Sequence, residues 1–218
     1  VNGSGKSTLF KALMGFVRLA QGEISILQLP VNKALKQNLI AYVPQSEEVD
    51  WSFPVLVEDV VMMGRFGHMG WLRRPKQIDH ACVDAALARV DMLDYRHRQI
   101  GELSGGQKKR VFLARAIAQD GQVILLDEPL NNLDMNYALQ MMQLLQNLVR
   151  DYGKTVVIVL HDINFAASFA DDIVAMKSGT IFAHDKTTNI INEPVLNDLY
   201  DMTIRIEEID GKKFCLYF

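Results

Sequence analysis

The 218-residue sequence has few cysteines, no long hydrophobic run and no block of like charges. Its two cysteines, Cys82 and Cys215, lie far apart and match no metal-binding spacing, and a reducing, cytosolic compartment is the simple interpretation. The longest aliphatic run, residues 156–160, is far shorter than the roughly 20 residues that cross a bilayer. A net charge of -3 without a basic block is not typical of a nucleic-acid-binding surface. We therefore expect an ordinary globular chain with no nucleic-acid partner.

What the sequence does contain is an alternation of apolar runs with helical patterns. Four apolar runs are predicted as strands: 24–27, 40–43, 123–126 and 156–160. Helical spacing or helix-end signals predict helices over 6–14, 57–63, 78–93, 104–118, 136–151 and near 193–200. A strand at 173–176, a turn at Ser178-Gly179 and a hairpin around Asp210-Gly211 follow. This alternation predicts an α/β fold with a mainly parallel sheet.

The strand pattern vanishes between about 51 and 119, which indicates an inserted helical subdomain. We expect a core formed by residues 1–50 and 120–186, with the helical subdomain over 51–119. Residues 187–218 would then add a C-terminal helix and a β-hairpin, whose role the sequence does not indicate.

The first ten residues, VNGSGKSTLF, contain the end of the phosphate-loop pattern G-x-x-x-x-G-K-[ST]. Gly5, Lys6 and Ser7 fill its last three places, and its first glycine would lie one position before Val1. Backbone N–H groups from Gly3 to Ser7 would face a phosphate at the positive end of a helix, and Lys6 would neutralise its charge. We therefore expect the sequence to begin inside its own nucleotide site.

Polar residues follow three of the predicted strands: Gln45, Asp127 with Glu128, and His161. Because ligands bind beyond the carboxyl ends of parallel strands, we expect these residues to converge with Lys6 on one crevice. Asp127 would hold a hydrated metal, and Glu128 would polarise the attacking water. Gln45 and His161 would reach the γ-phosphate, the metal or the water. Each feature alone also occurs in proteins without this chemistry, so the prediction depends on their combination.

The pentapeptide LSGGQ, residues 103–107, opens one of the predicted helices. It can be interpreted as an ordinary helix start, with Ser104 as the cap and two glycines in a turn. Glycines are poor helix formers, costing up to about 1 kcal/mol each, but they let a phosphate approach bare backbone N–H groups. Together with the phosphate loop, the chain has two helix N-termini suited to anions.

Taken together, NGSGKST, Gln45, LSGGQ, VILLDEP, NNLD and His161 resemble the nucleotide-binding subunit of an ATP-binding cassette transporter. The resemblance covers essentially the whole chain. It implies a phosphate-loop hydrolase core that lacks its N-terminal β segment, and an ATPase that uses ATP and Mg²⁺. In that family the LSGGQ of one cassette closes over the phosphate loop of another, which implies a homodimer or paired cassettes.

The resemblance also implies a role for each site residue. Glu128 would be the catalytic carboxylate, and His161 the switch histidine that senses the γ-phosphate. Gln45 would complete the catalytic set, and Ser7, Gln45 and Asp127 would hold Mg²⁺. By the family pattern, Asn132-Leu133-Asp134 is the D-loop, which crosses between subunits. The residues that would contact ATP belong to the phosphate loop, the LSGGQ segment and the D-loop: Asn2, Gly3, Ser4, Gly5, Lys6, Ser7, Thr8, Ser104, Gly105, Gly106, Gln107 and Asp134.

Two stretches bear on the class of transporter. Residues 45–74 resemble importers of manganese, iron or zinc ions, whereas the segments from LDEPLNNLD onward and the closing RIEEIDGKKFCLYF resemble the ferric-siderophore class. A recombined or misassembled gene is one hypothesis, which sequencing the native locus across residues 100–150 would test. Both stretches indicate import of a metal ion or a metal chelate. The aromatic and Met residues of 45–74 form either helical core or a groove for a cytoplasmic helix of the membrane subunit.

The resemblance implies a peripheral protein on the cytoplasmic face of the inner (plasma) membrane. Its partners would be a second copy, transmembrane permease subunits and, indirectly, a periplasmic or surface substrate-binding protein. Two other classes stay open: a non-transport cassette ATPase of the translation or DNA-repair type, and an inactive fragment. The family pattern places a β-rich segment with an adenine-stacking aromatic residue before the phosphate loop. We therefore expect residues 1–218 alone to be a poor ATPase.

Overall fold

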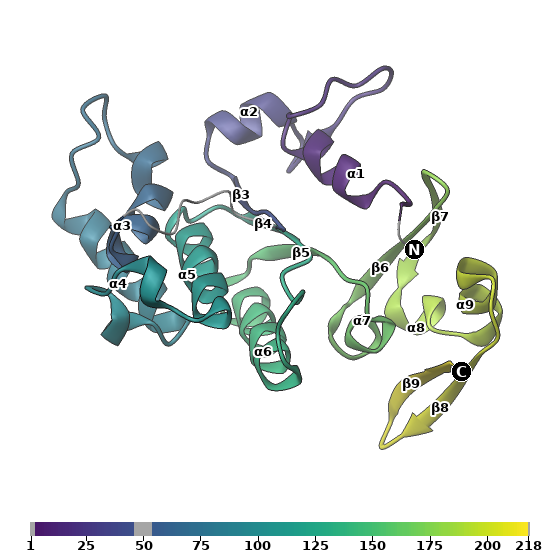
Figure 1. Ribbon diagram of the computed structural model, residues 1–218. Coiled ribbons are helices and arrows are strands. Elements are labelled where there is room, and N and C mark those ends of the chain that lie inside the picture. The colour runs from purple at the N-terminus through teal and green to yellow at the C-terminus, as the bar shows by residue number, and fades with distance from the viewer. Residues whose placement is uncertain (1–2, 46–53, 218) are drawn as a thin grey trace. The chain divides into compact units, whose positions relative to one another are not determined.

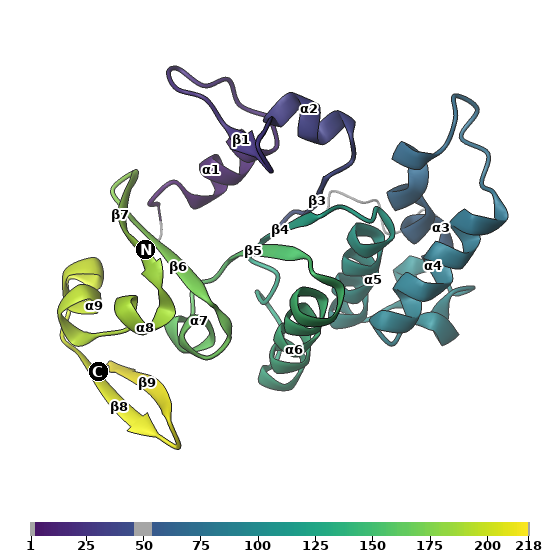
Figure 2. The same cartoon turned by 180° about the vertical axis from the view of Figure 1, so that it is seen from behind.

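A computed structural model describes residues 3–45 and 54–217 (Figures 1 and 2). The chain divides into two compact units. Of the described residues, the larger unit contains 12–45 and 54–158, and the smaller unit combines 3–11 with 159–217. Segments from both ends of the described chain therefore fold into one unit.

The larger unit contains the predicted sheet. Strands β3 (Ile40–Val43), β4 (Val123–Asp127) and β5 (Thr155–Val159) are neighbours in that order, and β3 pairs with β4 in parallel (Figure 1). Every residue of β4 is buried, as a run of aliphatic residues predicts for a central strand. The prediction of an α/β fold with a parallel sheet is confirmed.

Helix α6 (Met135–Tyr152) follows β4 and illustrates how the sequence sets a helix and its limits. Its buried residues recur at helical spacing: Ala138, Met141, Met142, Leu145 and Leu148. The Asp134 side chain caps the first turn, and Gly153 ends the helix at φ +61°. The long helix predicted here is confirmed.

The predicted strand over 24–27 was only partly right. Strand β1 (Ser25–Ile26) stops because Leu27 and Gln28 both have positive φ, at 51° and 63°. Two successive left-handed residues form a tight turn that leads the chain into the antiparallel strand β2 (Leu29–Pro30). Helix α2 (Val31–Lys36), which the sequence reading missed, follows directly.

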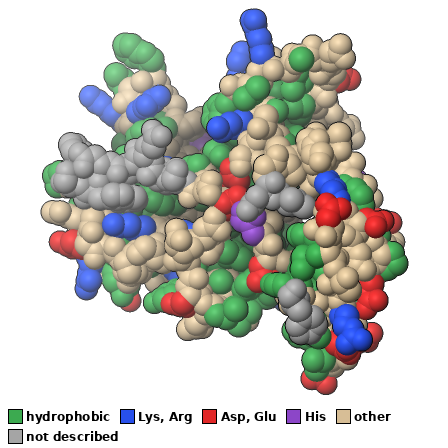
Figure 3. All heavy atoms as spheres, turned by 45° about the vertical axis from the view of Figure 1, so that its right-hand side comes forward, with side chains coloured by type: hydrophobic (Ala, Val, Ile, Leu, Met, Phe, Trp, Pro, Cys, Tyr) green, Lys and Arg blue, Asp and Glu red, His purple; other side chains and the backbone are tan. Residues whose placement is uncertain are grey.

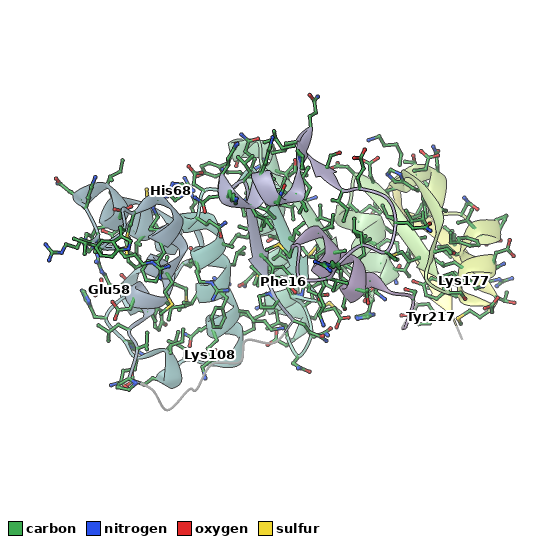
Figure 4. All side chains as sticks on the ribbon, turned by 90° about the horizontal axis from the view of Figure 1, so that it is seen from above. Phe16, Glu58, His68, Lys108, Lys177 and Tyr217 are labelled. Carbon is green, nitrogen blue, oxygen red and sulfur yellow. The ribbon has the colours of Figure 1, made fainter. Side chains whose placement is uncertain are left out.

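The regular elements of residues 54–118 are helices, in agreement with the absence of a strand pattern there, and a separate helical subdomain stays a prediction. The elements are α3 (Val57–Met62), the 3₁₀ segment η1 (Met63–His68), α4 (Gln77–Arg89), η2 (Leu93–Tyr95), η3 (Ile100–Glu102) and α5 (Gly105–Ala118). Figure 4 shows Glu58 on α3, His68 at the end of η1 and Lys108 on α5. The helix predicted over 78–93 was too long, because the chain turns at Asp91 with φ +56°.

A buried cation holds η1 against the end of α5. Arg65 is 7% exposed, and its Nε lies 3.1 Å from Asp79 Oδ1 on α4. Its Nη1 donates to the Ala118 carbonyl in the last turn of α5, at 2.9 Å. Gly64 permits this approach, because a Cβ there would lie 2.2 Å from the Arg115 carbonyl oxygen. The buried Arg65 side chain thus links η1 to α4 and to the C-terminus of α5.

The smaller unit consists of the start of α1 and a C-terminal group of elements. Helix α1 spans Lys6–Leu13 and begins in this unit. The C-terminal elements are α7 (Ile163–Phe169), β6 (Asp172–Lys177), β7 (Thr180–Lys186), α8 (Thr187–Ile190), α9 (Glu193–Tyr200), β8 (Ile204–Ile209) and β9 (Lys212–Tyr217). The predicted turn at Ser178-Gly179, the helix near 193–200 and the final hairpin are confirmed. Helix α7 and strand β7 were not predicted.

Side chains satisfy the backbone on both edges of the β8–β9 hairpin. Asn164, on α7, accepts from the Cys215 backbone N–H at 2.7 Å and donates to the Cys215 carbonyl at 3.2 Å. On the other edge, Asn197 Oδ1 accepts from the backbone N–H of Ile204, at 2.6 Å. Ile204 and Cys215 are themselves buried in the core of this unit. Glu207 on β8 is exposed. Figure 3 shows acidic and basic side chains intermixed on one face of the molecule. Both strand edges are therefore closed to further pairing near the core.

Candidate functional site

The phosphate-loop residues form a glycine-dependent turn that leads into α1. Gly3 and Gly5 have φ values of +72° and +94°, which L side chains rarely adopt. The helix starts at Lys6, and the Leu9 N–H donates to the Gly5 carbonyl at 2.9 Å. Ser4 is buried at 2% exposure. The glycine turn before a helix N-terminus is therefore present, and the binding of a phosphate there stays a prediction. Asn2 lies outside the described residues.

The LSGGQ segment starts α5 with a reciprocal cap. The Ser104 hydroxyl accepts from the Gln107 backbone N–H at 3.3 Å, and the Ser104 N–H donates to Gln107 Oε1 at 2.9 Å. Gly105 is exposed in the first turn, and a Cβ there would meet no atom within 4 Å, so this position is open on its outer side. The cap and the open glycine face are compatible with each other. Both interpretations of this segment, a helix cap and an anion site, thus fit the structure.

The end of β4 carries the two acidic residues of the predicted catalytic set. Asp127 is the last residue of the strand and is 4% exposed. Glu128 follows with a φ of +52°, a left-handed conformation that is costly for a residue with a side chain. Strained backbone at the end of a buried strand is typical of functional sites.

Glu128 accepts hydrogen bonds from two amide side chains. The Nε2 of Gln45 donates to Glu128 Oε2 at 2.5 Å, and the Nδ2 of Asn131 donates to the same oxygen at 2.5 Å. Gln45 and Glu128 are 83 positions apart in the chain. They meet because β3 and β4 are parallel neighbours, so the residues that follow them lie at the same edge of the sheet. This contact was predicted only as part of a common crevice, and no role was predicted for Asn131, although it lies in the NNLD motif.

The segment after Glu128 is held from two sides. The Lys109 ammonium on α5 donates to the Pro129 carbonyl at 2.9 Å and to the Asn131 carbonyl. Burial lowers the pKa of Lys109. Asp134 caps α6 by accepting from the Tyr137 N–H at 3.0 Å. Nothing in the sequence pattern singled out Lys109, which reads as one of two neighbouring lysines on a helix.

His161 and Lys6 belong to the smaller unit, whereas Gln45, Asp127 and Glu128 belong to the larger one. His161 is exposed, and the next residue, Asp162, caps α7 through the Asn164 N–H at 2.7 Å. The convergence of all five residues on one crevice stays a prediction.

Similar proteins are known among metal-import systems. The chain is 55% identical over 186 residues to the manganese transport system ATP-binding protein MntA of Synechocystis, which covers 85% of this chain and 71% of that protein. It is 51% identical over 183 residues to the chelated iron transport system membrane protein YfeB of Yersinia pestis, covering 84% of this chain and 62% of that protein. It is 38% identical to the petrobactin import ATP-binding protein YclP of Bacillus subtilis, covering 100% of this chain and 86% of that protein.

Solved structures agree with this grouping. A metal-chelate type ABC transporter in an inward-facing conformation matches with a TM-score of 0.88 at 29% identity, covering 100% of this chain and 84% of that chain. A dimeric ATP-binding cassette with bound ADP and phosphate matches with a TM-score of 0.70 at 29% identity, covering 86% of this chain and 82% of that chain. The family model described as "ABC transporter" matches residues 1–131, more than half of the chain. The chain therefore belongs to the ABC transporter family.

Proposed function

We propose that this chain is the ATP-hydrolysing subunit that powers import of a metal ion or a metal chelate through a separate membrane permease. The observation that carries the ATPase assignment is the contact of Gln45 with Glu128 at the carboxyl edge of the parallel sheet. It brings together two residues that the family pattern assigns to hydrolysis. The metal cargo is supported by relatives whose names specify manganese, chelated iron and petrobactin systems.

Each group has a physical task in hydrolysis. The N–H groups at the start of α1 and the Lys6 ammonium hold the phosphates, so that charge developing on the γ-phosphoryl group is already compensated. Glu128, which follows the buried strand β4, orients and polarises the attacking water. His161 contacts the γ-phosphate, and the LSGGQ of a second copy covers the nucleotide.

The three predicted Mg²⁺ ligands, Ser7, Gln45 and Asp127, all offer oxygen atoms, the ligand type that this ion prefers. Gln45 donates through its amide nitrogen to Glu128, so its amide oxygen is the atom that a metal would take. The buried Asp127 carboxylate and the Ser7 hydroxyl would supply the other protein oxygens. When bound, the ion neutralises phosphate charge. Within the described residues, no group of three or more His, Cys, Asp or Glu side chains could hold a metal by itself.

The partners we propose are a second copy of the chain, permease subunits and, indirectly, a substrate-binding protein outside the membrane. A solved dimeric cassette among the structural neighbours supports the pairing. No helix in residues 3–45 and 54–217 combines the length and apolar character of a bilayer-spanning segment. We place the protein at the cytoplasmic face of the membrane, bound to its permease.

The test uses the full-length protein, including any residues that precede Val1 in its gene. Glu128→Gln keeps the side-chain shape but weakens water activation, so we expect ATP turnover to fall and ATP to accumulate in a closed dimer. Sizing chromatography with ATP and a phosphate-release assay measure both effects. Turnover near that of the wild type, without an ATP-dependent dimer, would count against Glu128 as the catalytic carboxylate.

The transport part is tested separately by affinity purification from membranes and by uptake. We expect a polytopic membrane protein to co-purify, and cells lacking the gene to lose uptake of either free Mn²⁺ or a ferric siderophore. Comparing the two cargoes with radiolabelled metal distinguishes the two classes of importer. A chain that binds no membrane protein and whose deletion leaves both uptake activities unchanged would contradict the transport role.

A further inference from the structure

The Glu128 carboxylate is contacted by Asn131, a residue of the NNLD motif to which the family resemblance assigned no role. Gln45 and Asn131 donate to the same carboxylate oxygen, each at 2.5 Å. Gln45 reaches it from the end of β3, whereas Asn131 lies only three positions further along the chain from Glu128. Two donors that approach one oxygen from different segments restrict the rotation of the carboxyl group. Glu128 is thus held by two independent side chains.

The turn that carries Asn131 is strained and would not keep its shape alone. Glu128 and Asn132 both have positive φ, at 52° and 60°. Such conformations persist in residues with side chains only when the surroundings fix them. Two weak backbone hydrogen bonds lie within the turn, from Asn131 N–H to the Glu128 carbonyl at 3.3 Å and from Leu133 N–H to the Leu130 carbonyl at 3.2 Å.

Lys109 supplies the missing anchor from another element. Its ammonium donates to the Pro129 carbonyl at 2.9 Å and also to the Asn131 carbonyl, so it holds the turn on both sides of Leu130. Lys109 lies on α5, five positions after the Ser104 cap. Partial burial of an ammonium group costs free energy, and the lowered pKa of Lys109 records that cost. A surface lysine without a structural task would extend into water.

We propose that Lys109 and Asn131 are positioning residues for ATP hydrolysis: Lys109 fastens the turn after Glu128 to the helix that begins with LSGGQ, and Asn131 fixes the Glu128 carboxylate. The proposal rests on the proposed function, because it assigns a task only if Glu128 acts on the attacking water. In the proposed dimer each chain contributes to two ATP sites, with its LSGGQ segment at one and its Glu128 at the other. The proposed hydrogen bonds connect these two contributions within one chain. The end of α5 that faces a partner's nucleotide and the carboxylate that acts on the chain's own nucleotide then share one set of hydrogen bonds.

The experiment measures kcat and KM for Mg-ATP in full-length protein carrying Asn131→Ala, Lys109→Met or Lys109→Arg. We expect Asn131→Ala to lower kcat at least about tenfold, because small misplacement of a reacting group costs up to about 100-fold, with little change in KM. Lys109→Met should likewise lower kcat with little change in KM. Lys109→Arg should retain most of kcat, because it keeps a cationic donor. Asn147→Ala and Lys154→Met are matched controls, since these side chains bond Arg150 and Asp120 instead.

Two further measurements separate positioning from a general loss of structure. Combined with Glu128→Gln, Asn131→Ala should cause no further loss of rate, because the group that it positions has already been disabled. Binding of a fluorescent ATP analogue should keep its stoichiometry in every variant. The proposal is overturned if Asn131→Ala has the kcat of the wild type, or if its loss is undiminished on top of Glu128→Gln. If Glu128→Gln alone retains full turnover, the proposed function itself fails, and this inference fails with it for a different reason.

Discussion

The two glycine-rich helix starts of this chain use glycine for different reasons. At the start of α1, Gly3 and Gly5 have φ values of +72° and +94°. No side-chain residue adopts these conformations without strain, so the backbone path itself requires glycine. A Cβ on Gly5 would meet Gly179 and Met176 only at 3.8 Å, which is ordinary contact. The requirement at this loop is therefore conformational, not steric.

At the start of α5 the situation is reversed. Gly105 and Gly106 lie in an α-helix whose first turn is capped by Ser104. A Cβ on Gly105 would meet no atom within 4 Å, and one on Gly106 would meet Leu133 and Tyr137 no closer than 3.6 Å. Alanine would fit at both positions and is the better helix former by up to about 1 kcal/mol. The fold of a single chain therefore tolerates these glycines without requiring them.

This difference teaches what each sequence motif encodes. The phosphate loop encodes a backbone shape, and that shape points N–H groups toward a phosphate. The LSGGQ segment encodes an absence of side chain on an ordinary helix, which is useful only if something from outside approaches it closely. The contrast supports the proposed pairing of two copies around ATP.

The largest effect is expected from a change in the phosphate loop, the first of the two helix starts. Lys6→Ala removes the ammonium that counters the β- and γ-phosphate charge, so we expect loss of ATP binding and of hydrolysis in the full-length protein. Fluorescent-nucleotide titration and phosphate release measure the two quantities. Lys11→Ala, on the exposed side of the same helix, is the matched control and should bind ATP as the wild type does. Unchanged turnover in Lys6→Ala would refute the role given to this lysine.

The next effect acts at the other helix start. Ser104→Arg places a long side chain where the nucleotide of a partner would lie, so we expect hydrolysis to be blocked while a dilute monomer keeps its affinity for ATP. Ser104→Thr retains a capping hydroxyl and serves as the control. A collapse of affinity in the monomer would mean that LSGGQ contacts the chain's own nucleotide or is needed for folding.

A smaller effect is expected for Gly5→Ala, which tests the conformational requirement directly. Forcing a Cβ into a φ of +94° costs about 1–3 kcal/mol, to be relieved by a change in the loop or by loss of stability. We expect weaker ATP binding together with a lower melting temperature. If Gly5→Ala melts and binds as the wild type does, the glycine is not required by the backbone.

The sequence predicted those features that depend on local pattern. Four consecutive aliphatic residues identified β4, and the helical pattern over 136–151 identified α6. The positive φ values at Leu27 and Gln28 escaped prediction, because neither residue type favours that conformation. Tight turns that contain such residues are set by the strands they join, not by their own preferences.

The candidate site divides in the same way. Glu128 and Gln45 were recognisable because they follow predicted strands, and the phosphate loop was recognisable from its own motif. The tasks of Asn131 and Lys109 were not, because they depend on how α5 packs beside the turn after Glu128, and side-chain contacts across 22 positions leave no local pattern. Lys108 and Lys109 are neighbours in the sequence, and the packing of α5 determines that Lys109 contacts the turn after Glu128.

The smallest expected effect, and the one that sharpens the comparison most, is at Gly105. Gly105→Ala should raise the free energy of unfolding by a few tenths to about 1 kcal/mol, because alanine is the better helix former and meets no atom within 4 Å. The same methyl group lies on the face that a partner's phosphate would approach, so we expect kcat/KM for ATP to fall several-fold.

The matched control is Gly153→Ala at the end of α6, where φ is +61° and the neighbouring space is also empty. It should lower stability by about 1 kcal/mol, since the left-handed C-terminal position favours glycine, and leave ATP turnover unchanged. Chemical denaturation and phosphate release, measured on the same samples, give both quantities. We expect Gly105→Ala to be more stable but less active, and Gly153→Ala to be less stable but fully active. This result would show that Gly105 is required for a ligand and Gly153 for the fold. A destabilised Gly105→Ala, or one that hydrolyses ATP at the rate of the wild type, would make Gly105 an ordinary helix-start glycine.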